Sequence, residues 1–232
     1  KLSDVRLLAP VLPRSKVVHV GKNYQDHAEE MGGGVPIEPL IFLTPNTAVI
    51  GPDETIVWPR ISERIDFEGE LVVVIGRICK DVPRERYKEV IFGYTIGNDI
   101  TARDLQNRDG QWTRSKSFDT FKPIGPWIET DFKPANQKIE ARVNGELKQT
   151  STLDQMIFNV PRIINFISSV MTLLPGDVII TGTPSLRRKY LDMALIQTSE
   201  NYKKNLNLYI QHHTLSKFVR TFILRTISSS SI

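Results

Sequence analysis

The chain has 232 residues, of which 40% are hydrophobic and 24% are charged, and its formal net charge is +4. Such a chain is typical of a soluble globular protein that buries a substantial core in one domain, or in one domain plus an arm. The one cysteine, Cys79, excludes an internal disulfide framework and a zinc site built from several cysteines. No stretch reaches the roughly 20 apolar residues that are needed to cross a bilayer, so we expect no membrane partner.

Short strands and one short helix are predicted for the first third of the chain. Asn23 or Asp26 can cap a helix that carries His27 and Glu30, because a short polar side chain at this place accepts from the first free N–H groups. Apolar and β-branched runs predict the strands, and a glycine-rich stretch predicts a loop. These elements are strands over 16–20, 40–43, 54–59 and 65–76, and a loop over 31–39.

The rest of the chain, up to residue 184, is also predicted to be mostly β. A proline suited to a first helical turn opens a short helix over 82–91, and the strand that follows, over 92–99, ends in Asp99. The Asn144–Gly145 pair predicts a hairpin over 139–151, since both residues tolerate the positive φ of a two-residue turn. The other elements are a long polar connection over 100–121, a helix over 161–173, and a turn with a buried strand over 174–184.

Three acidic residues begin the strand over 65–76. Asp66, Glu68 and Glu70 alternate along it, and alternate residues of a strand face the same way. Like charges held side by side repel, so either these acids face water at a frayed strand end or a cation offsets their repulsion. Glu68, Glu70 and Asp99 would form a set of oxygen ligands with no Cys or His nearby, which suits Mg²⁺, Mn²⁺ or Ca²⁺ rather than zinc. Asp66 would then stay outside the ligand set, as a supporting or a solvated carboxylate.

Six stretches of the chain, read together, resemble the fumarylacetoacetate hydrolase family in order and spacing. The most specific are DFEGELVVVIG, NDITARDLQ and KSFDTF, whereas TGTP alone would mean little. The resemblance implies a mainly β (α+β) fold with short helices, a rolled mixed β-sandwich that is usually dimeric and binds Mg²⁺ or Mn²⁺. The six stretches cover most of residues 17–184 and are 21–31, 66–76, 93–106, 115–128, 143–158 and 175–184.

The resemblance also implies roles for individual residues. Three carboxylates would bind the metal ion, one lysine and two polar residues would contact the substrate, and a His–Glu pair on a lid helix would activate water in hydrolytic members. In that order, these residues are Glu68, Glu70 and Asp99; Lys116, Gln106 and Thr183; and His27 and Glu30.

Several of these residues have a plainer alternative. His27 could be an exposed helix residue with Glu30 as its neighbour, although their spacing does place both side chains on one helix face. Lys116 could be solvated, as most lysines are. We interpret Arg103 and Asp104 as a structural pair rather than as part of the chemistry.

The implied reaction is the hydrolysis of a carbon–carbon bond in a short acylpyruvate or a related 2,4-dioxo acid. A divalent cation would stabilise the enolate of this substrate, and His27, oriented by Glu30, would deprotonate the attacking water. Decarboxylation or isomerisation of a 2-oxo acid such as oxaloacetate would use the same frame. We expect a homodimer with a small 2-oxo acid as its substrate, no nucleic-acid partner, and a cytoplasmic location, or a mitochondrial one if a targeting segment was removed.

The composition of the chain breaks at Pro184. All 14 glycines and all 14 prolines lie at or before it, and residues 185–232 hold eight Lys or Arg against two acidic residues. Family members continue with a glycine-rich segment and a closing hairpin, which this sequence does not match. We therefore expect an arm over 1–16, a catalytic domain over 17–184 and an atypical basic tail over 185–232, with the closing strands missing.

Two alternatives for the tail remain open at this point. It could form an amphipathic helix over 208–224, with basic residues that bind a membrane surface, a nucleic acid or a partner, or it could stay disordered. Loss of the closing strands would also allow an impaired homologue that acts only as a binding or dimerisation module.

Overall fold

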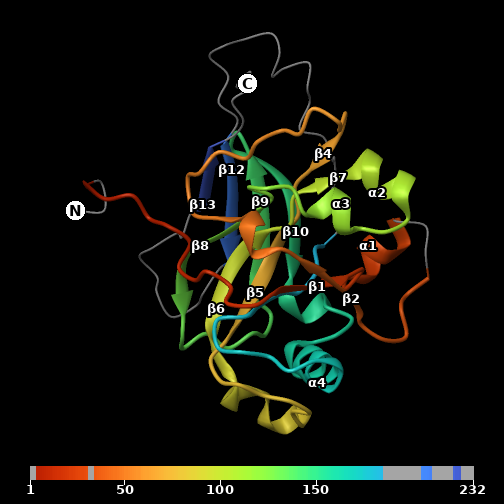
Figure 1. The fold of residues 1–232 in the computed structure, drawn as a ribbon, viewed down its shortest axis with the longest axis vertical. Helices are drawn as coiled ribbons and strands as arrows, with labels where there is room; N and C mark the ends of the chain where they lie inside the picture. The colour runs from red at the N-terminus through yellow and green to blue at the C-terminus, as the bar shows by residue number, and fades with distance from the viewer. Residues whose placement is uncertain (1–3, 31–33, 185–204, 211–221, 226–232) are drawn as a thin grey trace.

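The computed structural model describes residues 4–30, 34–184, 205–210 and 222–225, and strands predominate in it (Figure 1). The strands are β1 (Val17–Gly21), β2 (Leu40–Thr44), β3 (Val49–Ile50), β4 (Ile65–Asp66), β5 (Gly69–Ile75), β6 (Ile91–Asn98), β7 (Thr101–Ala102), β8 (Lys122–Glu129), β9 (Lys138–Val143), β10 (Glu146–Thr152), β11 (Val178–Ile180), β12 (Asn205–Ile210) and β13 (Phe222–Arg225). The helices are α1 (Gln25–Glu30), α2 (Arg103–Asp109), α3 (Thr113–Lys116) and α4 (Val160–Val170), with 3₁₀ turns η2 (Asn46–Ala48), η3 (Arg84–Glu89) and η4 (Leu153–Gln155). The prediction of a mainly β fold with short helices is confirmed.

A seven-stranded mixed sheet forms the centre of the fold, with the strand order β2-β1-β11-β5-β6-β8-β3. Its middle strand, β5, is buried along its whole length, which explains the continuous apolar run from Leu71 to Ile75. β5 pairs antiparallel with both β6 and β11, whereas β1 pairs in parallel with β11. The acidic residues at the start of β5 therefore lie beside the end of β6.

A second sheet has the strand order β10-β9-β12-β13 and contains the predicted hairpin. Asn144 and Gly145 join β9 to β10, and their φ values of 52° and 84° are the positive pair that a two-residue hairpin turn requires. The tail supplies the other two strands, because β12 pairs antiparallel with β9 and β13 pairs with β12. The structure thus has paired strands where we expected closing strands to be missing, and these strands occupy both ends of the alternative helix over 208–224. Strands pair through their backbone N–H and carbonyl groups, so the absence of glycine and proline from the tail does not prevent β12 and β13 from forming.

Helix α4 corresponds to the helix predicted over 161–173 and packs against the main sheet. It begins at a capping residue, Asn159, whose side chain accepts from the N–H of Arg162 at 3.2 Å, and a proline occupies its first turn. One face of the helix enters the largest core cluster together with residues of β1, β5 and β11. The fully buried apolar residues of this face are Ile163, Ile164 and Ile167.

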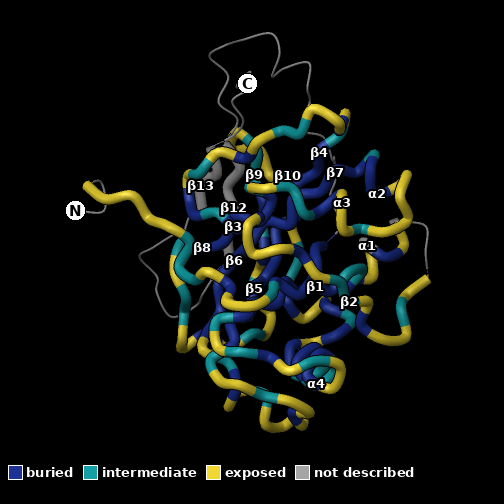
Figure 2. Tube along the Cα trace, viewed as in Figure 1, coloured by how far each residue is buried: buried dark blue, intermediate teal, exposed yellow. Residues whose placement is uncertain are grey.

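A second apolar cluster fixes the segments on either side of the β5–β6 pair. Ile65 of β4, Phe67, Ile100, Leu105 of α2 and Phe121 belong to it, and none is more than 1% exposed. Figure 2 shows this region within the buried centre of the fold, whereas the connections around α4 are exposed. The acidic stretch therefore rests on packed apolar residues and does not fray into solvent.

Four predicted elements differ from the structure, and one of them, the strand over 65–76, is divided between β4 and β5. Residues 54–59 form no strand, because Pro59 cannot continue a hydrogen-bonded ladder and the N–H of Val57 donates to the hydroxyl of Thr120 at 2.8 Å. The polar connection over 100–121 contains β7, α2 and α3, with α2 ending at Gly110 in the left-handed conformation (φ 68°). The helix predicted over 82–91 is the 3₁₀ segment η3.

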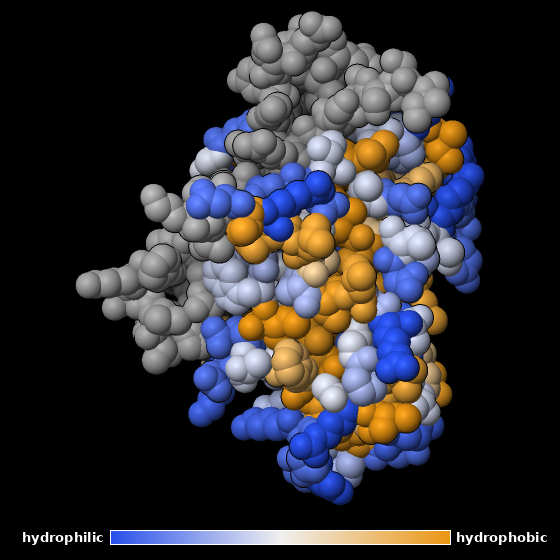
Figure 3. Space-filling model, turned by 60° about the vertical axis from the view of Figure 1, so that its left-hand side comes forward, coloured by the Kyte–Doolittle hydropathy of each residue, from blue (hydrophilic) through white to orange (hydrophobic). Residues whose placement is uncertain are grey.

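One outer face gathers apolar side chains (Figure 3). Among the described residues, large exposed apolar side chains include Phe92 of β6 and Trp127 of β8, which lie on neighbouring strands, and Leu8 and Leu12 of the N-terminal segment. Exposed apolar groups that gather in this way mark candidate interaction surfaces. The described helices include none with the length and apolar character to cross a bilayer.

Asn23, two residues after the end of β1, connects three separate segments. Its buried side-chain amide donates to the carbonyls of Phe158 at 3.0 Å and Thr181 at 2.7 Å, and it accepts from the N–H of Phe158 at 2.7 Å. These bonds fix the start of α1 against the approach to α4 and against the segment after β11.

We expect Asn23→Ala to lower the free energy of unfolding by about 3 kcal/mol, because each of the three lost bonds contributes about 1 kcal/mol and their backbone partners stay buried. Urea denaturation measures this change. The exposed Asn46 donates one bond to the carbonyl of Pro13 at 3.3 Å, and Asn46→Ala serves as the control. The control should lose less than about 0.5 kcal/mol, and equal losses in both variants would contradict the connecting role of Asn23.

Candidate active site

Three carboxylates meet where β5 begins and β6 ends. One oxygen each of Glu68, Glu70 and Asp99 lies within 4.8 Å of the other two, and all three side chains are buried. Strand pairing brings them together, because Glu70 pairs with Gly97 and the N–H of Asp99 donates to the carbonyl of Glu68 at 2.8 Å. The structure thus assembles the three acids that the sequence singles out, while their role as metal ligands stays a prediction.

Asp66 lies apart from this cluster. It ends β4, and β5 begins only at Gly69, so one continuous strand does not carry all three alternating acids. Asp66 is fully buried, with Oδ2 2.8 Å from Nε of Arg103 and Oδ1 3.1 Å from Nε of Arg64. Two guanidinium groups hold it inside the protein, so the solvated alternative is wrong.

Arg103 reaches into the cluster, a role that differs from the structural pair predicted for it. Its guanidinium contacts the carboxylates of Asp66 and Glu68 and the side-chain oxygen of Gln106. Asp104 accepts instead from a serine hydroxyl and a backbone N–H, so the predicted Arg103–Asp104 pair is wrong. Adjacent residues of a helix point in different directions, whereas the i, i+3 spacing of Arg103 and Gln106 was a signal that they share a face.

Lys116 lies between two of the carboxylates. Its ammonium is 2.9 Å from Oε2 of Glu68, 2.6 Å from Oδ2 of Asp99 and 2.8 Å from the hydroxyl of Thr101. With 3% of its surface exposed, the side chain is not the solvated lysine of the plainer alternative. Burial alone would lower the pKa of Lys116, but the charges of Asp99 and Glu68 outweigh burial and raise it.

Two further basic side chains, neither of them predicted from the sequence, lie against Asp99. Nζ of the fully buried Lys122 is 2.8 Å from Oδ1 of Asp99. Nδ1 of the buried His19 is 3.2 Å from Oδ2, its Nε2 is 2.8 Å from the hydroxyl of Thr44, and its ring stacks on Phe42. Both residues lie next to apolar strand residues, where no neighbour in the sequence indicates a distant acidic partner.

A pocket opens onto this cluster. Gln106 and Thr183 line it, so the structure places both predicted substrate contacts beside the acids. The remaining lining residues are Val20, Gly21, Lys22, Phe42, Glu68, Glu70, Asp99, Arg103, Trp112 and Lys116. His27 and Glu30 belong to α1, but their side chains lie outside the described part of the structure, and their roles stay predictions.

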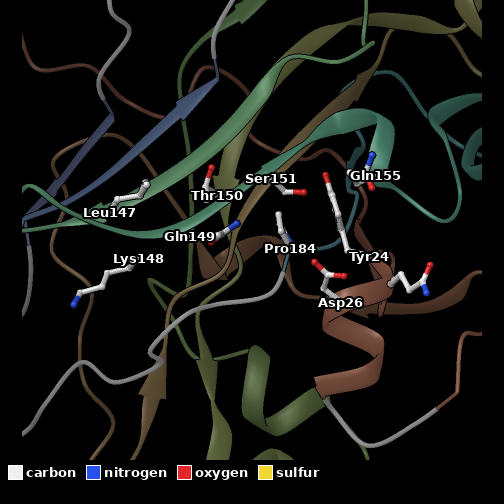
Figure 4. A pocket seen from close by; sticks show the side chains of 10 residues that line it. Tyr24, Asp26, Leu147, Lys148, Gln149, Thr150, Ser151, Gln155 and Pro184 are labelled. Atoms are coloured by element: carbon white, nitrogen blue, oxygen red, sulfur yellow. The ribbon is translucent and has the colours of Figure 1, made fainter.

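A second pocket lies between the start of α1 and strand β10 (Figure 4). Tyr24 and Asp26 line it from one side and Gln149 from the other, with Pro184 between them in the view. Thr183 lines the first pocket and Pro184 the second, so both pockets border the segment that follows β11.

The carboxylates differ in how well neighbouring cations compensate their charge. Burial, followed by the charges of Asp99 and Glu68, raises the pKa of Glu70 well above its ordinary value. Burial would raise the pKa of Asp99 as well, but the nearby Lys116, Lys122 and His19 outweigh it and hold that pKa well below the ordinary value. Glu70 is therefore the acid of the cluster that gains most from an additional cation.

The donor set fits a hard divalent cation. The three oxygens of Glu68, Glu70 and Asp99 converge without a sulfur ligand, which is the chemistry that Mg²⁺ and Mn²⁺ favour. An ion held by these residues would also supply the positive charge that the surroundings of Glu70 lack.

Metal binding should therefore strengthen as the pH rises. The pKa of Glu70 lies well above its ordinary value of 4.5, so below the raised pKa an ion must displace a proton in order to bind. We expect the Kd for Mn²⁺ to fall by up to about tenfold per pH unit below that pKa and to level off above it. Electron paramagnetic resonance of free Mn²⁺ measures this Kd. The Glu70→Gln variant should bind more weakly and show a flatter profile, and a native Kd that does not change from about pH 5 to 8 would contradict the prediction.

Comparison with known proteins identifies the family. Residues 16–205 match the family model described as fumarylacetoacetate (FAA) hydrolase C-terminal. The chain is 45% identical over 187 residues to "Oxaloacetate tautomerase FAHD2B, mitochondrial" of Bos taurus, an alignment that covers 78% of this chain and 60% of that protein.

Solved structures show the same fold. An X-ray structure of 5-carboxymethyl-2-hydroxymuconate delta-isomerase from Mycobacterium smegmatis has a TM-score of 0.83 at 45% identity, covering 99% of this chain and 85% of that one. A structure of maleylpyruvate hydrolase from Sphingobium sp. SYK-6, in complex with manganese (II) ion and pyruvate, has a TM-score of 0.78 at 30% identity, covering 97% and 75%. These similar proteins are named as a tautomerase, an isomerase and a hydrolase. The chain belongs to the fumarylacetoacetate hydrolase family, as its six sequence stretches predict.

Proposed function

We propose that this chain is a divalent-metal-dependent enzyme that hydrolyses a carbon–carbon bond of a short acylpyruvate or a related 2,4-dioxo acid. The observation that carries the proposal is the buried meeting of three carboxylates with the Lys116 ammonium in one pocket. The names of the similar proteins support the broader statement that the chain is an enzyme acting on an oxo acid.

The charges of the site support an anionic substrate. Four buried carboxylates meet three buried cations, and a divalent ion would change the net charge of these groups from −1 to +1. A positive pocket with apolar walls attracts a carboxylate-bearing substrate. The seven groups are Asp66, Glu68, Glu70, Asp99, Arg103, Lys116 and Lys122.

When bound, the ion would act as a Lewis acid that stabilises negative charge on the 2-oxo oxygen of the substrate. We propose Mg²⁺ or Mn²⁺ as the ion, and the manganese in the related hydrolase structure supports this choice. Lys116 stays protonated because Asp99 and Glu68 raise its pKa, so it can hold a carboxylate or oxo oxygen by a charged hydrogen bond. Gln106 and Thr183 supply further polar contacts along the same pocket.

For the hydrolytic step we propose His27 as the base, with Glu30 as the residue that orients it. Their i, i+3 spacing in the sequence predicts that both side chains share one helix face. His27 would remove a proton from water as the water oxygen attacks the carbonyl carbon farther from the carboxylate. The carbon–carbon bond then breaks, the acyl part leaves as a carboxylic acid, and a proton returns to the carbon of pyruvate.

A tautomerase or isomerase of a 2-oxo diacid is the second candidate. The two relatives with 45% identity carry such names, and these reactions need only proton transfers in the same pocket, without an attacking water. Decarboxylation of oxaloacetate is a further possibility on the same frame. The hypothesis of an impaired homologue rested on missing closing strands. The paired strands β12 and β13 in the described part of the tail weaken that argument.

Two substrates and two variants separate these candidates. We expect the native protein with Mg²⁺ to form pyruvate from acetylpyruvate, and His27→Ala to lower kcat at least about 100-fold because the base is lost. Glu68→Ala should abolish Mn²⁺ binding and turnover together, whereas His27→Ala should leave Mn²⁺ binding unchanged. Glu29→Gln is the matched control, since this exposed carboxylate lies on the same helix and bonds only to Gln25 among the contacts described.

The outcomes are distinct for each candidate. Hydrolysis of acetylpyruvate that survives in His27→Ala would contradict the role of His27 as the base. Tautomerisation of oxaloacetate that survives in His27→Ala, without acetylpyruvate hydrolysis in the native protein, would favour the second candidate. Oxalate binding without any turnover would favour the binding module.

We also propose a homodimer, which the exposed apolar side chains of Phe92 and Trp127 support. Light scattering coupled to gel filtration should give twice the mass of one chain, and the mass of a single chain would contradict the proposal. The cytoplasmic location stays a prediction, with the mitochondrial alternative supported by the name of the bovine relative.

A further inference from the structure

Lys122 is a buried lysine that does not line the pocket. It is the first residue of β8 and has no exposed surface. Its ammonium is 2.8 Å from Oδ1 of Asp99 and donates to the carbonyls of Ile100 and Phe121, each at 3.2 Å. All three neighbours are protein oxygens, so Lys122 acts on Asp99 and not on a substrate.

The two oxygens of Asp99 have different surroundings. Lys122 contacts Oδ1, whereas Oδ2 faces Lys116, which lines the pocket, and Nδ1 of His19. An ion in the pocket would meet Oδ2, because Oδ2 lies on the side of the pocket residue Lys116, whereas Oδ1 lies on the side of β8 in an ion pair with Lys122.

The other two acids share this arrangement. Arg103 binds Oε1 of Glu68 and leaves Oε2 beside Lys116. The N–H of Gly182 binds Oε2 of Glu70. Arg103, the N–H of Gly182 and Lys122 thus each contact one oxygen of a different carboxylate, while the pocket residue Lys116 contacts the second oxygen of Glu68 and of Asp99.

From this asymmetry we propose that Lys122 is a positioning residue that restricts Asp99 to one ligand oxygen and so favours Mn²⁺ and Mg²⁺ over Ca²⁺. The proposal rests on the metal site of the proposed function. Mg²⁺ requires nearly octahedral geometry with oxygens at about 2.0–2.1 Å, whereas Ca²⁺ takes six to eight oxygens at about 2.3–2.6 Å and often binds both oxygens of one carboxylate. A carboxylate with one oxygen held by Lys122 suits the first geometry.

A purely electrostatic role of Lys122 predicts a different result. An ammonium close to the site repels every divalent ion, so its removal would strengthen the binding of Mn²⁺ and Ca²⁺ by similar factors. A positioning role instead changes the ratio of the two dissociation constants. This ratio, which needs no substrate, separates the two roles.

The test is Lys122→Met, which keeps a long unbranched side chain and removes its charge. Mn²⁺ binding is followed by electron paramagnetic resonance, and Ca²⁺ binding by its competition with Mn²⁺. Changes in the groups around metal ligands typically alter affinity 10- to 100-fold, so we expect the ratio of the Ca²⁺ Kd to the Mn²⁺ Kd to fall by about tenfold or more. An unchanged ratio overturns the proposal.

Lys16→Met is the matched control. Lys16 forms an ion pair of 2.5 Å with the buried Asp177, a residue outside the pocket, so this variant also removes a lysine from a buried carboxylate. In this variant the ratio of the Ca²⁺ Kd to the Mn²⁺ Kd should equal that of the native protein. A decrease in this ratio as large as that in Lys122→Met would overturn the proposal.

A crystal structure of the native protein with Mn²⁺ provides a test that does not depend on a variant that folds. We expect Asp99 to bind the ion through Oδ2 alone, with Lys122 still on Oδ1. Binding through both oxygens overturns the role of Lys122 while the proposed function stands. A native protein that binds neither Mn²⁺ nor Ca²⁺ overturns the metal site and this proposal together.

Discussion

The close approach of like charges inside the protein is the constraint on which the structure depends. Glu68, Glu70 and Asp99 lie within 4.8 Å of one another and are buried, where water screens their repulsion poorly. Removing each such charge from water costs several kcal/mol unless a partner compensates it. Three buried cations do so in part, and they come from the first residue of α2, the last residue of α3 and the first residue of β8. The long polar connection after β6 carries two of these cations, Arg103 and Lys116, to the acids, and it leads into the third, Lys122.

Side chains complete the pairing of β5 with β6 at the point where the acids begin. Asn98 accepts from the N–H of Glu68 at 2.9 Å, and the amide of Gln149 bonds both the N–H and the carbonyl of Gly69. Because side chains alternate along a strand, a slip of one residue would turn Glu70 to the opposite face. β11 pairs along the other edge of β5, so the register is held from both sides. The acids therefore meet through a register that the whole sheet determines.

Local patterns in the sequence predict the elements that depend on neighbouring residues. The Asn144–Gly145 turn and the start of α4 follow from backbone preferences within a few positions, and both are found in the structure. The contact of Arg103 with Asp66 spans 37 residues, and the ion pair of Lys122 with Asp99 depends on β8 lying next to β6. No local pattern contains such information. The motif resemblance located the acids and Lys116 because it carries information about the assembled fold, and it offered no reason to separate Arg103 from Asp104.

The buried cluster and the outer parts of the pocket have separate chemical tasks. Stabilising negative charge on a 2-oxo oxygen is common to hydrolysis, tautomerisation and decarboxylation, so the cluster alone cannot select among them. The reaction that takes place must therefore depend on groups that deliver water or protons and on pocket walls that fit the rest of the substrate. Trp112 packs edge-on against Phe42 at 5.1 Å, and Phe42 stacks at 4.6 Å on His19, whose Nδ1 is 3.2 Å from Asp99. A continuous aromatic contact thus joins one wall of the pocket to the acidic cluster, and a change of that wall would alter both the space for the substrate and the position of Asp99.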